Sequence, residues 1–432
     1  MHHRARSTRT AALAVAAVAS VGLAGAAPAL AAPPPPSDPQ LWVNPDSTYH
    51  EHVENLGLTG DASDDALYLA QFPTATWFTA GTPTSVKQEV KDVVVHAHAD
   101  GEIPVLVAYN LPFRDCAQYS AGGATSVEEY KAWIDGFAKG IGNKQAMVIL
   151  EPDGLGIIPW YTTVEGVSEW CKPAEADPET AAADRFEMLR YAVDTLGSLP
   201  GTEVYLDGTH PAWLNVGDIT DRLLKAGVER ATGFFLNASN YQYTANSVAY
   251  GRWISSCIAL VTQLDAGVGD CGNQYWNGGP ATDWQGTGMD PYAEWASGPL
   301  SEVPLERNTI GVDSRYAAQL GDVEPTTTFV VDTSRNGLGP WDPATSANTY
   351  PDAEAWCNPP DRGLGLRPTL DTGEELVDGF LWIKVPGESD GQCFRGTGGP
   401  EDPERGMVAP PAGQWFVEQA DELIALANPP AE

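Results

Sequence analysis

Two acidic residues, Asp115 and Asp153, each follow a run of apolar, β-forming residues. Asp115 lies in the string from Val107 to Cys116, and Asp153 ends the string Ile149-Leu150-Glu151-Pro152-Asp153. In a parallel β/α barrel the loops that follow the strands line the active site. Two carboxyl groups with different pKa values can protonate a leaving oxygen and activate a water, which is what cleavage of an acetal between sugars requires. The pair therefore predicts a two-carboxylate hydrolase.

The residues around the two acids predict different roles for them. The neighbours of Asp153 are apolar and are expected to raise its pKa and keep it protonated as the acid. Asp115 follows Arg114, whose guanidinium is expected to favour the ionised carboxylate, and that charge would in turn help Asp153 to hold its proton. The apolar neighbours are Leu150, Pro152, Leu155 and Ile157.

Short β-rich runs alternate along the chain with segments of helical period, which is the pattern of a mainly parallel sheet wrapped by helices. Helices are expected from Ser85 to His98 and from Gln414 to Ala427, and no internal repeat or second module is visible. The sequence predicts an α/β fold with seven strands: Thr74 to Phe78, Pro104 to Tyr109, Ala146 to Leu150, Glu203 to Leu206, Gly233 to Leu236, Thr327 to Val331, and Phe380 to Val385.

Polar clusters follow six of these seven strands, and Trp77 ends the first. An acid or amide at a strand end often caps a helix or starts a turn, which explains any single position. Caps do not require Lys, Arg, His and Trp, so the set as a whole predicts a polar cleft. The clusters are Asn110/Arg114/Asp115, Glu151/Asp153, Asp207/His210, Asn237/Asn240, Asp332/Ser334/Arg335 and Lys384/Glu388/Asp390.

The chain has 14 tryptophans, and three of them favour a sugar ligand. Trp77, Trp213 and Trp356 lie in or beside the strand-end loops, where a flat ring can stack on a pyranose face. Core packing is the alternative for any one of them, because tryptophan is usually well buried.

Residues 1–31 are interpreted as a secretory signal peptide. Arg4, Arg6 and Arg9 precede the apolar run from Ala11 to Ala19, and Ala29-Leu30-Ala31 offers small residues for cleavage. No later run approaches the length of a membrane span. We expect residues 32–432 to form a single catalytic domain that is secreted, extracellular and monomeric.

The net charge of −34 argues against nucleic acid and anionic membranes as partners, because both require a basic face. A neutral substrate fits this surface. The six cysteines show no C-x-x-C spacing, so we expect no metal or other cofactor. We expect the six cysteines to form three disulfides instead. Pairing of near neighbours, one of fifteen possibilities, gives Cys116 with Cys171, Cys257 with Cys271, and Cys357 with Cys393.

Two of the strings are similar to the signatures of glycoside hydrolase family 6, the inverting cellulases, in its actinobacterial type. They are V-x-Y-x-x-P-x-R-D-C from Val107 to Cys116 and the apolar run with E-P-D from Val148 to Asp153. Further matches occur in the same order along almost the whole chain: Leu41 to Pro45, Tyr205 to Trp213, Asn237 to Tyr241, Val331 to Gly337, Trp356 to Pro359, and Leu381 to Gly391.

The resemblance implies a distorted seven-stranded parallel β/α barrel that hydrolyses β-1,4-glucan. It implies that Asp153 is the proton donor, that Asp115 tunes it and joins a water relay, and that Asp390 matches the acid often proposed as the base. The substrate-binding residues that it implies are Trp77, Tyr109, Ser120, Asp207, His210, Trp213, Asn240, Trp356, Lys384 and Glu388.

Loop lengths bear on endo or exo action. The segment from Cys116 to Tyr130 is short, as in the open-cleft endoglucanases of the family, and favours endo action. The insert from Cys257 to Gln319 and the segment from Asp390 to Trp415 are long and would partly roof the cleft, as in a cellobiohydrolase.

Three rival interpretations exist. His96 and His98 suggest a metal-dependent barrel hydrolase, but they lie in a helix-like stretch, where residues two apart do not share a face. A non-catalytic glucan-binding protein would use the tryptophans and would have no use for Asp153. A retaining glycosidase would release the other anomer first.

Overall fold

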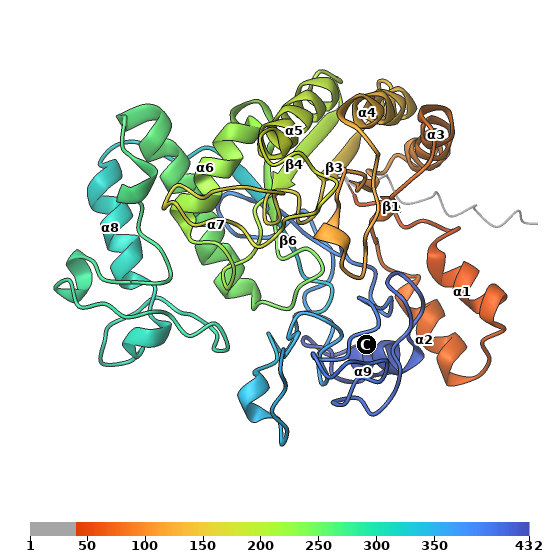
Figure 1. Ribbon diagram of the computed structural model, residues 1–432. Helices are drawn as coiled ribbons and strands as arrows, with labels where there is room; N and C mark the ends of the chain where they lie inside the picture. The colour runs from red at the N-terminus through yellow and green to blue at the C-terminus, as the bar shows by residue number, and fades with distance from the viewer. Residues whose placement is uncertain (1–39, 432) are drawn as a thin grey trace, which may run out of the picture. The chain divides into compact units, whose positions relative to one another are not determined.

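A single sheet of seven parallel strands lies at the centre of the fold (Figure 1). The computed structural model describes residues 40–431, and the signal peptide expected over residues 1–31 lies outside them. Each strand pairs with the next in chain order, so the sheet curls into a distorted β/α barrel, as predicted. The strands are β1 (Thr76–Phe78), β2 (Val105–Ala108), β3 (Ala146–Leu150), β4 (Thr202–Asp207), β5 (Gly233–Leu236), β6 (Thr328–Asp332) and β7 (Val377–Leu381).

Alternating side chains of each strand enter two different cores. In β3, Met147 and Ile149 join the apolar cluster inside the barrel, whereas Val148 and Leu150 join the cluster between the sheet and the helices. This follows from the period of two along a strand. Because both faces are covered, all five residues of β3 are buried and the strand is apolar throughout.

Helices cover the outer face of the sheet. Each helix from α3 to α8 packs against the next, while α2 packs against α1 and α9 (Figure 1). The helices are α1 (Thr48–Leu56), α2 (Asp61–Leu69), α3 (Pro83–Asp100), α4 (Val127–Ile141), α5 (Ala181–Gly197), α6 (Val216–Ala226), α7 (Thr244–Leu264), α8 (Ile310–Leu320) and α9 (Val417–Ala425).

Helix α3 shows how the sequence sets helix bounds. Thr82 and Ser85 form a reciprocal capping box around Pro83, and Gly101 ends the helix with φ 78°. The expected helix from Ser85 to His98 is thereby confirmed. His96 and His98 are exposed on it.

The barrel has a seam between its first and last strands. Within the described residues β1 and β7 share no ladder. The seam is bridged by the N–H of Ala75, which donates to the carbonyl of Trp382 at 3.0 Å, and by Trp77 Nε1, which donates to the carbonyl of Ile383 at 2.8 Å.

The last strand differs from the expected run of Phe380 to Val385. It ends at Leu381, because the carboxylate of Asp332 accepts the backbone N–H groups of Ile383 and Lys384, at 3.3 and 3.0 Å. Those groups are therefore not available to continue a ladder, and the chain turns toward the barrel opening.

The three disulfides pair near neighbours, as predicted. They join Cys116 to Cys171, Cys257 to Cys271 and Cys357 to Cys393. Among the helices of residues 40–431, none is both long and apolar enough to cross a membrane.

Candidate active site

A cavity of about 820 Å³ opens where the loops that follow the strands converge. It brings together Asp115, Asp153 and Asp390, although they follow β2, β3 and β7. Nine of the ten residues expected to bind substrate also line it: Trp77, Tyr109, Ser120, His210, Trp213, Asn240, Trp356, Lys384 and Glu388.

Asp153 lies in the cavity wall without a polar partner. Among the described residues no hydrogen bond or ion pair reaches its carboxyl group, and Leu150 and Leu155 beside it are fully buried. Burial, together with the negative charges of Asp207 and Asp115, raises the pKa of Asp153 well above its ordinary value. The protonated form of the carboxyl group is therefore favoured, and the direction of the shift agrees with the expectation from its apolar neighbours.

The backbone that carries Asp153 is strained. Asp153 has φ 61° and Glu151 has φ 58°, on either side of Pro152. Left-handed backbone is uncommon for residues other than glycine and is often found at functional sites. The Glu151 carboxylate supports the turn, because it accepts the N–H groups of Asn110 and Leu111.

Asp115 is held by Ser120. Its Oδ2 atom accepts the Ser120 backbone N–H at 2.8 Å and the Ser120 hydroxyl at 3.0 Å, and that hydroxyl lies 3.2 Å from the Tyr109 hydroxyl. These groups form one hydroxyl–carboxylate relay along the cavity wall.

Arg114 favours the ionised form of Asp115, as expected, but it does not set the net direction of the pKa shift. Burial raises the pKa of Asp115, and the opposing effects of Ser120 and Arg114 are smaller. Arg114 gives its N–H groups to the carbonyls of Ser120, Thr79 and Tyr109 instead, and lies over the Tyr109 ring. The guanidinium therefore fixes the loop more than it stabilises the carboxylate.

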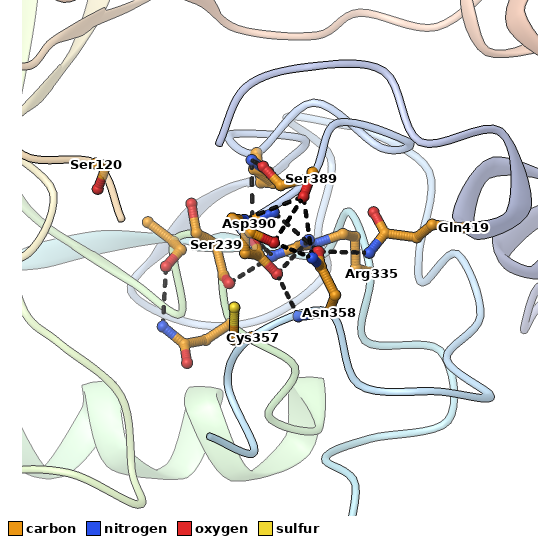
Figure 2. Close-up of polar contacts among 12 residues, drawn as sticks. Ser120, Ser239, Arg335, Cys357, Asn358, Ser389, Asp390 and Gln419 are labelled. Carbon is orange, nitrogen blue, oxygen red and sulfur yellow. Dashed lines mark hydrogen bonds and ion pairs between the residues drawn. The ribbon is translucent and has the colours of Figure 1, made fainter. Parts of the chain in front are cut away.

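Asp390 lies in a dense set of donors (Figure 2). Arg335 forms a bidentate ion pair with it at 3.0 and 2.9 Å, and Oδ2 also accepts the Tyr241 hydroxyl and the Asn358 N–H, each at 3.0 Å. Although burial opposes ionisation, the positive charges of Arg335 and Lys384 (Nζ at 3.7 Å) lower the pKa of Asp390 below its ordinary value.

Asn358 fixes the backbone of this acid. Its Oδ1 accepts the Asp390 N–H at 2.8 Å and is itself held by Gln419 of α9 at 3.1 Å (Figure 2). Asp390 is therefore kept both ionised and immobile.

Two further cavity residues flank Asp390. Burial lowers the pKa of Lys384, whose Nζ also donates to the Ser389 carbonyl at 3.1 Å. Glu388 pairs with His52 of α1 at 3.1 Å, so the N-terminal helices also help to shape the rim.

Asp207 does not line the cavity, which corrects its expected place among the substrate-binding residues. It is buried behind the wall and accepts the N–H groups of Leu155, Gly156 and Thr209 at 3.0, 3.0 and 2.8 Å. Burial raises its pKa to about 6. Asp207 therefore holds the loop that carries Asp153 and adds to the charge that keeps Asp153 protonated.

His210 and Trp213 form one wall of the cavity. Burial lowers the pKa of His210 to about 4, and its Nδ1 accepts the Ala212 N–H at 3.2 Å, so the neutral ring directs Nε2–H elsewhere. A Cβ atom on Gly156 would lie 2.4 Å from the Trp213 ring, so glycine is required for this ring position.

Several residues of the site were given no role in the sequence analysis. Arg335, which was predicted only as part of the polar cleft, holds Asp390 together with Tyr241 and Asn358, and the cavity is also lined by Trp170 and Tyr119. Arg335 and Tyr241 belong to strings that follow β6 and β5, so the polar residue after a strand was a usable signal for them. Trp170 follows no strand and gave no such signal.

The loop after β2 meets the segment between β6 and β7. The Tyr119 hydroxyl donates to Glu354 Oε1 at 2.8 Å, and the Tyr119 ring packs against Trp356 and Phe394. The long insert contributes Pro291 and Tyr292 to the cavity lining.

Chemically, the cavity combines a carboxyl group of strongly raised pKa, Asp153, a second of raised pKa in a hydroxyl relay, Asp115, and a third of lowered pKa, Asp390, beside several aromatic rings. Over the described part of the chain, no group of three or more His, Cys, Asp or Glu side chains is arranged to hold a metal ion. His96 and His98 do not line the cavity.

Comparisons with known proteins agree with this arrangement. The model of the glycosyl hydrolases family 6 matches residues 37–427. Endoglucanase A of Cellulomonas fimi is 33% identical over 83% of this chain, which spans 56% of that protein's length. A probable 1,4-beta-D-glucan cellobiohydrolase C of Aspergillus terreus is 29% identical over 90% of this chain and 75% of its own.

A solved structure is also similar. The endoglucanase Cel6 from Mycobacterium tuberculosis, in complex with methyl-cellobiosyl-4-deoxy-4-thio-β-D-cellobioside, is 28% identical and superposes with a TM-score of 0.60. The match covers 90% of this chain and 97% of that one.

Proposed function

The chain belongs to family 6 of the glycosyl hydrolases, and from that premise we propose that it is a secreted β-1,4-glucanase that cleaves cellulose-type chains with inversion. The proposal is carried by Asp153, which has no described hydrogen-bond partner and a strongly raised pKa, in an aromatic-lined cavity. A glucan-binding protein without activity would not require a buried acid with a raised pKa beside two further carboxylates. We further propose that residues 32–432 form the one catalytic domain of a monomeric protein.

In the proposed reaction Asp153 gives its proton to the glycosidic oxygen as the bond to the leaving sugar breaks. A water attacks the anomeric carbon from the opposite face and loses a proton, and the anomeric configuration is inverted. Trp77, Trp213 and Trp356 stack on the sugar rings, while His210, Asn240, Lys384 and Glu388 bind hydroxyl groups.

The environments of the two remaining acids favour different roles for them. The raised pKa of Asp115 makes it the better proton acceptor, and its bond to the Ser120 hydroxyl supports a relay from the attacking water. Asp390 is a weak base, because Arg335 and Lys384 lower its pKa. We propose that Asp390 fixes the position of this water and stabilises the positive charge of the transition state.

The endo mode is our first candidate, because the segment from Cys116 to Tyr130 is short. Exo action is the second candidate, and the Tyr119–Glu354 hydrogen bond favours it, since it joins two loops that both line the cavity.

Viscosity and reducing ends measured together on carboxymethyl cellulose separate these modes. Endo action predicts a steep early fall in viscosity with few new ends, and exo action predicts the reverse.

Proton NMR of cellotetraose hydrolysis tests inversion: the α anomer is expected first, and a β anomer would contradict it. Absence of all hydrolysis would reject the function.

A further inference from the structure

The strongly exposed aromatic side chains of the described residues fall into two sets. Trp170, Tyr292 and Trp356 line the cavity. The other set comprises Tyr275, Trp276 and Trp284, which are 54%, 41% and 57% exposed and lie outside the cavity lining. We call this second set the aromatic strip. It lies in the insert between α7 and α8, drawn in green to teal in Figure 1.

The aromatic strip is joined directly to the cavity wall. The Tyr275 hydroxyl donates to the backbone carbonyl of Trp213 at 2.8 Å. The preceding residue, Gln274, donates to the carbonyls of Pro211 and Leu214 at 2.9 and 2.8 Å. Because Trp213 itself lines the cavity, the strip continues outward from a wall of the candidate active site.

Two rings of the strip lie nearly parallel to each other. Trp276 and Trp284 lie with centroids 6.5 Å apart and planes inclined by only 14°. Trp276 packs against Gly278 and Gly286, where a Cβ atom would come within 2.5 and 2.7 Å of neighbouring atoms. The absence of side chains at these glycines therefore lets the Trp276 ring lie against the backbone.

The turn that carries Trp284 has strained backbone angles and is fixed by hydrogen bonds. Asp283 and Trp284 have φ 49° and 60°, a conformation that is costly for a bulky residue. The Trp284 N–H donates to the Gly279 carbonyl at 2.9 Å, and the Ala281 N–H donates to Ser314 of α8 at 3.0 Å. The backbone strain of this turn is therefore not offset by burial of the Trp284 side chain, which stays largely exposed.

We propose that the aromatic strip binds a β-1,4-glucan chain that extends beyond the cleft past Trp213, and this inference rests on the proposed function. Aromatic rings stack on the apolar faces of pyranose units. Because the Trp276 ring already lies against Gly278 and Gly286, its ordering on binding loses little conformational entropy. A neutral polymer also meets no repulsion from a chain of net charge −34.

The test removes one ring with little disturbance to the backbone. Trp284→Gly suits the positive φ at this position, and Trp284→Tyr keeps a stacking ring. Leu67→Ala, on α2, is the control, because it truncates a side chain of 41% exposure that is neither in the cavity lining nor in the strip. Adsorption to insoluble cellulose is measured with Asp153→Asn added to every variant, so that the substrate is not consumed.

We expect Trp284→Gly to lower the adsorption constant about tenfold, as loss of one well-placed aromatic contact commonly does. Trp284→Tyr is expected to restore most of it, and Leu67→Ala to change nothing. With Asp153 intact, cellotetraose turnover is expected to be the same in all three variants, because this short substrate fits within the cleft.

Unchanged adsorption of Trp284→Gly, with normal cellotetraose turnover, would overturn the strip proposal and leave the proposed function standing. If the unsubstituted protein does not cleave cellotetraose, the function fails instead. Concentration-dependent sedimentation that Trp284→Gly abolishes would show that a second copy occupies the strip, and this result would also overturn the proposal.

Discussion

The two sides of the cavity shift the pKa of an aspartate side chain in opposite directions. After β3, Asp153 is partly buried beside apolar residues, has no described polar partner and has a raised pKa. After β7, Asp390 is buried as well, but Arg335, Tyr241 and Asn358 bind it and its pKa is lowered. Burial alone therefore does not decide the charge of a carboxyl group; the supply of donors does.

In the proposed reaction, this difference separates Asp153, which exchanges a proton, from Asp390, which keeps its negative charge. A donor near Asp153 would stabilise the carboxylate and weaken the acid. Loss of a donor near Asp390 would leave a buried charge unpaired. The two sides should therefore respond to substitution in different quantities: turnover on the Asp153 side, and stability on the Asp390 side.

The largest effect is expected from Asp153→Asn, because an amide cannot give the acid proton. Turnover of cellotetraose should fall by about 10³-fold to 10⁴-fold, while its dissociation constant, measured by calorimetry, stays near that of the parent. Asp322→Asn, an exposed substitution, is the matched control. Near-normal turnover in Asp153→Asn would end the assignment of the acid.

Arg335→Leu tests the opposite side through stability. It leaves Asp390 buried without its bidentate partner and should lower the free energy of unfolding by about 3–5 kcal/mol, measured with urea. Arg252→Leu breaks an ion pair whose side chains are 43% and 44% exposed and should cost no more than about 1 kcal/mol. Equal losses in the two variants would remove the contrast between the sides.

Asp115→Asn tests the coupling between the acids through pH. The negative charge of Asp115 raises the pKa of Asp153. Asp153 must be protonated to act, so activity falls as pH rises through its pKa. Without that charge the pKa falls, and the alkaline limb of kcat should move to lower pH, with turnover down by about 100-fold. An alkaline limb that stays in place would separate the two residues.

Ser120→Ala should give the smallest effect. The Ser120 hydroxyl lowers the pKa of Asp115, so its removal raises that pKa further. Because Asp115 must be ionised to accept a proton, activity is lost as pH falls through its pKa, and the acid limb should move to higher pH. Turnover should fall by about fivefold to tenfold, which corresponds to one hydrogen bond of about 1 kcal/mol. An acid limb shifted the other way would exclude Asp115 from the relay.

The strands were predictable from the sequence because a barrel strand is buried on both faces. The runs Ala146–Leu150 and Gly233–Leu236 were predicted to the residue. The last strand was misplaced, because its apolar run continues past Leu381 to Val385 while its hydrogen bonds pass to the Asp332 carboxylate. Because a side chain that is distant in sequence ends this strand ladder, the local composition does not show where the strand ends.

The candidate site was predictable in position and less so in its interactions. The strand-end rule located the three acids, and the apolar neighbours of Asp153 indicated its raised pKa. The direction of Arg114 was not visible, since a guanidinium beside an acid in sequence can turn to backbone carbonyls instead. The role of Asp207 also depends on backbone N–H groups about fifty positions away, which only the fold brings near.

The seam between β1 and β7 makes the barrel a split ring. The other neighbouring strands are joined by ladders of hydrogen bonds. At the seam, the described residues supply two hydrogen bonds, from Ala75 and Trp77 to the carbonyls of Trp382 and Ile383. On one side of this seam, β1 carries Trp77, and on the other side the chain after β7 leads to Lys384 and Asp390. The part of the cavity wall between Trp77 and Asp390 therefore depends on these two hydrogen bonds and on the packing of Trp77 against the apolar cluster that contains Trp382, rather than on a strand ladder.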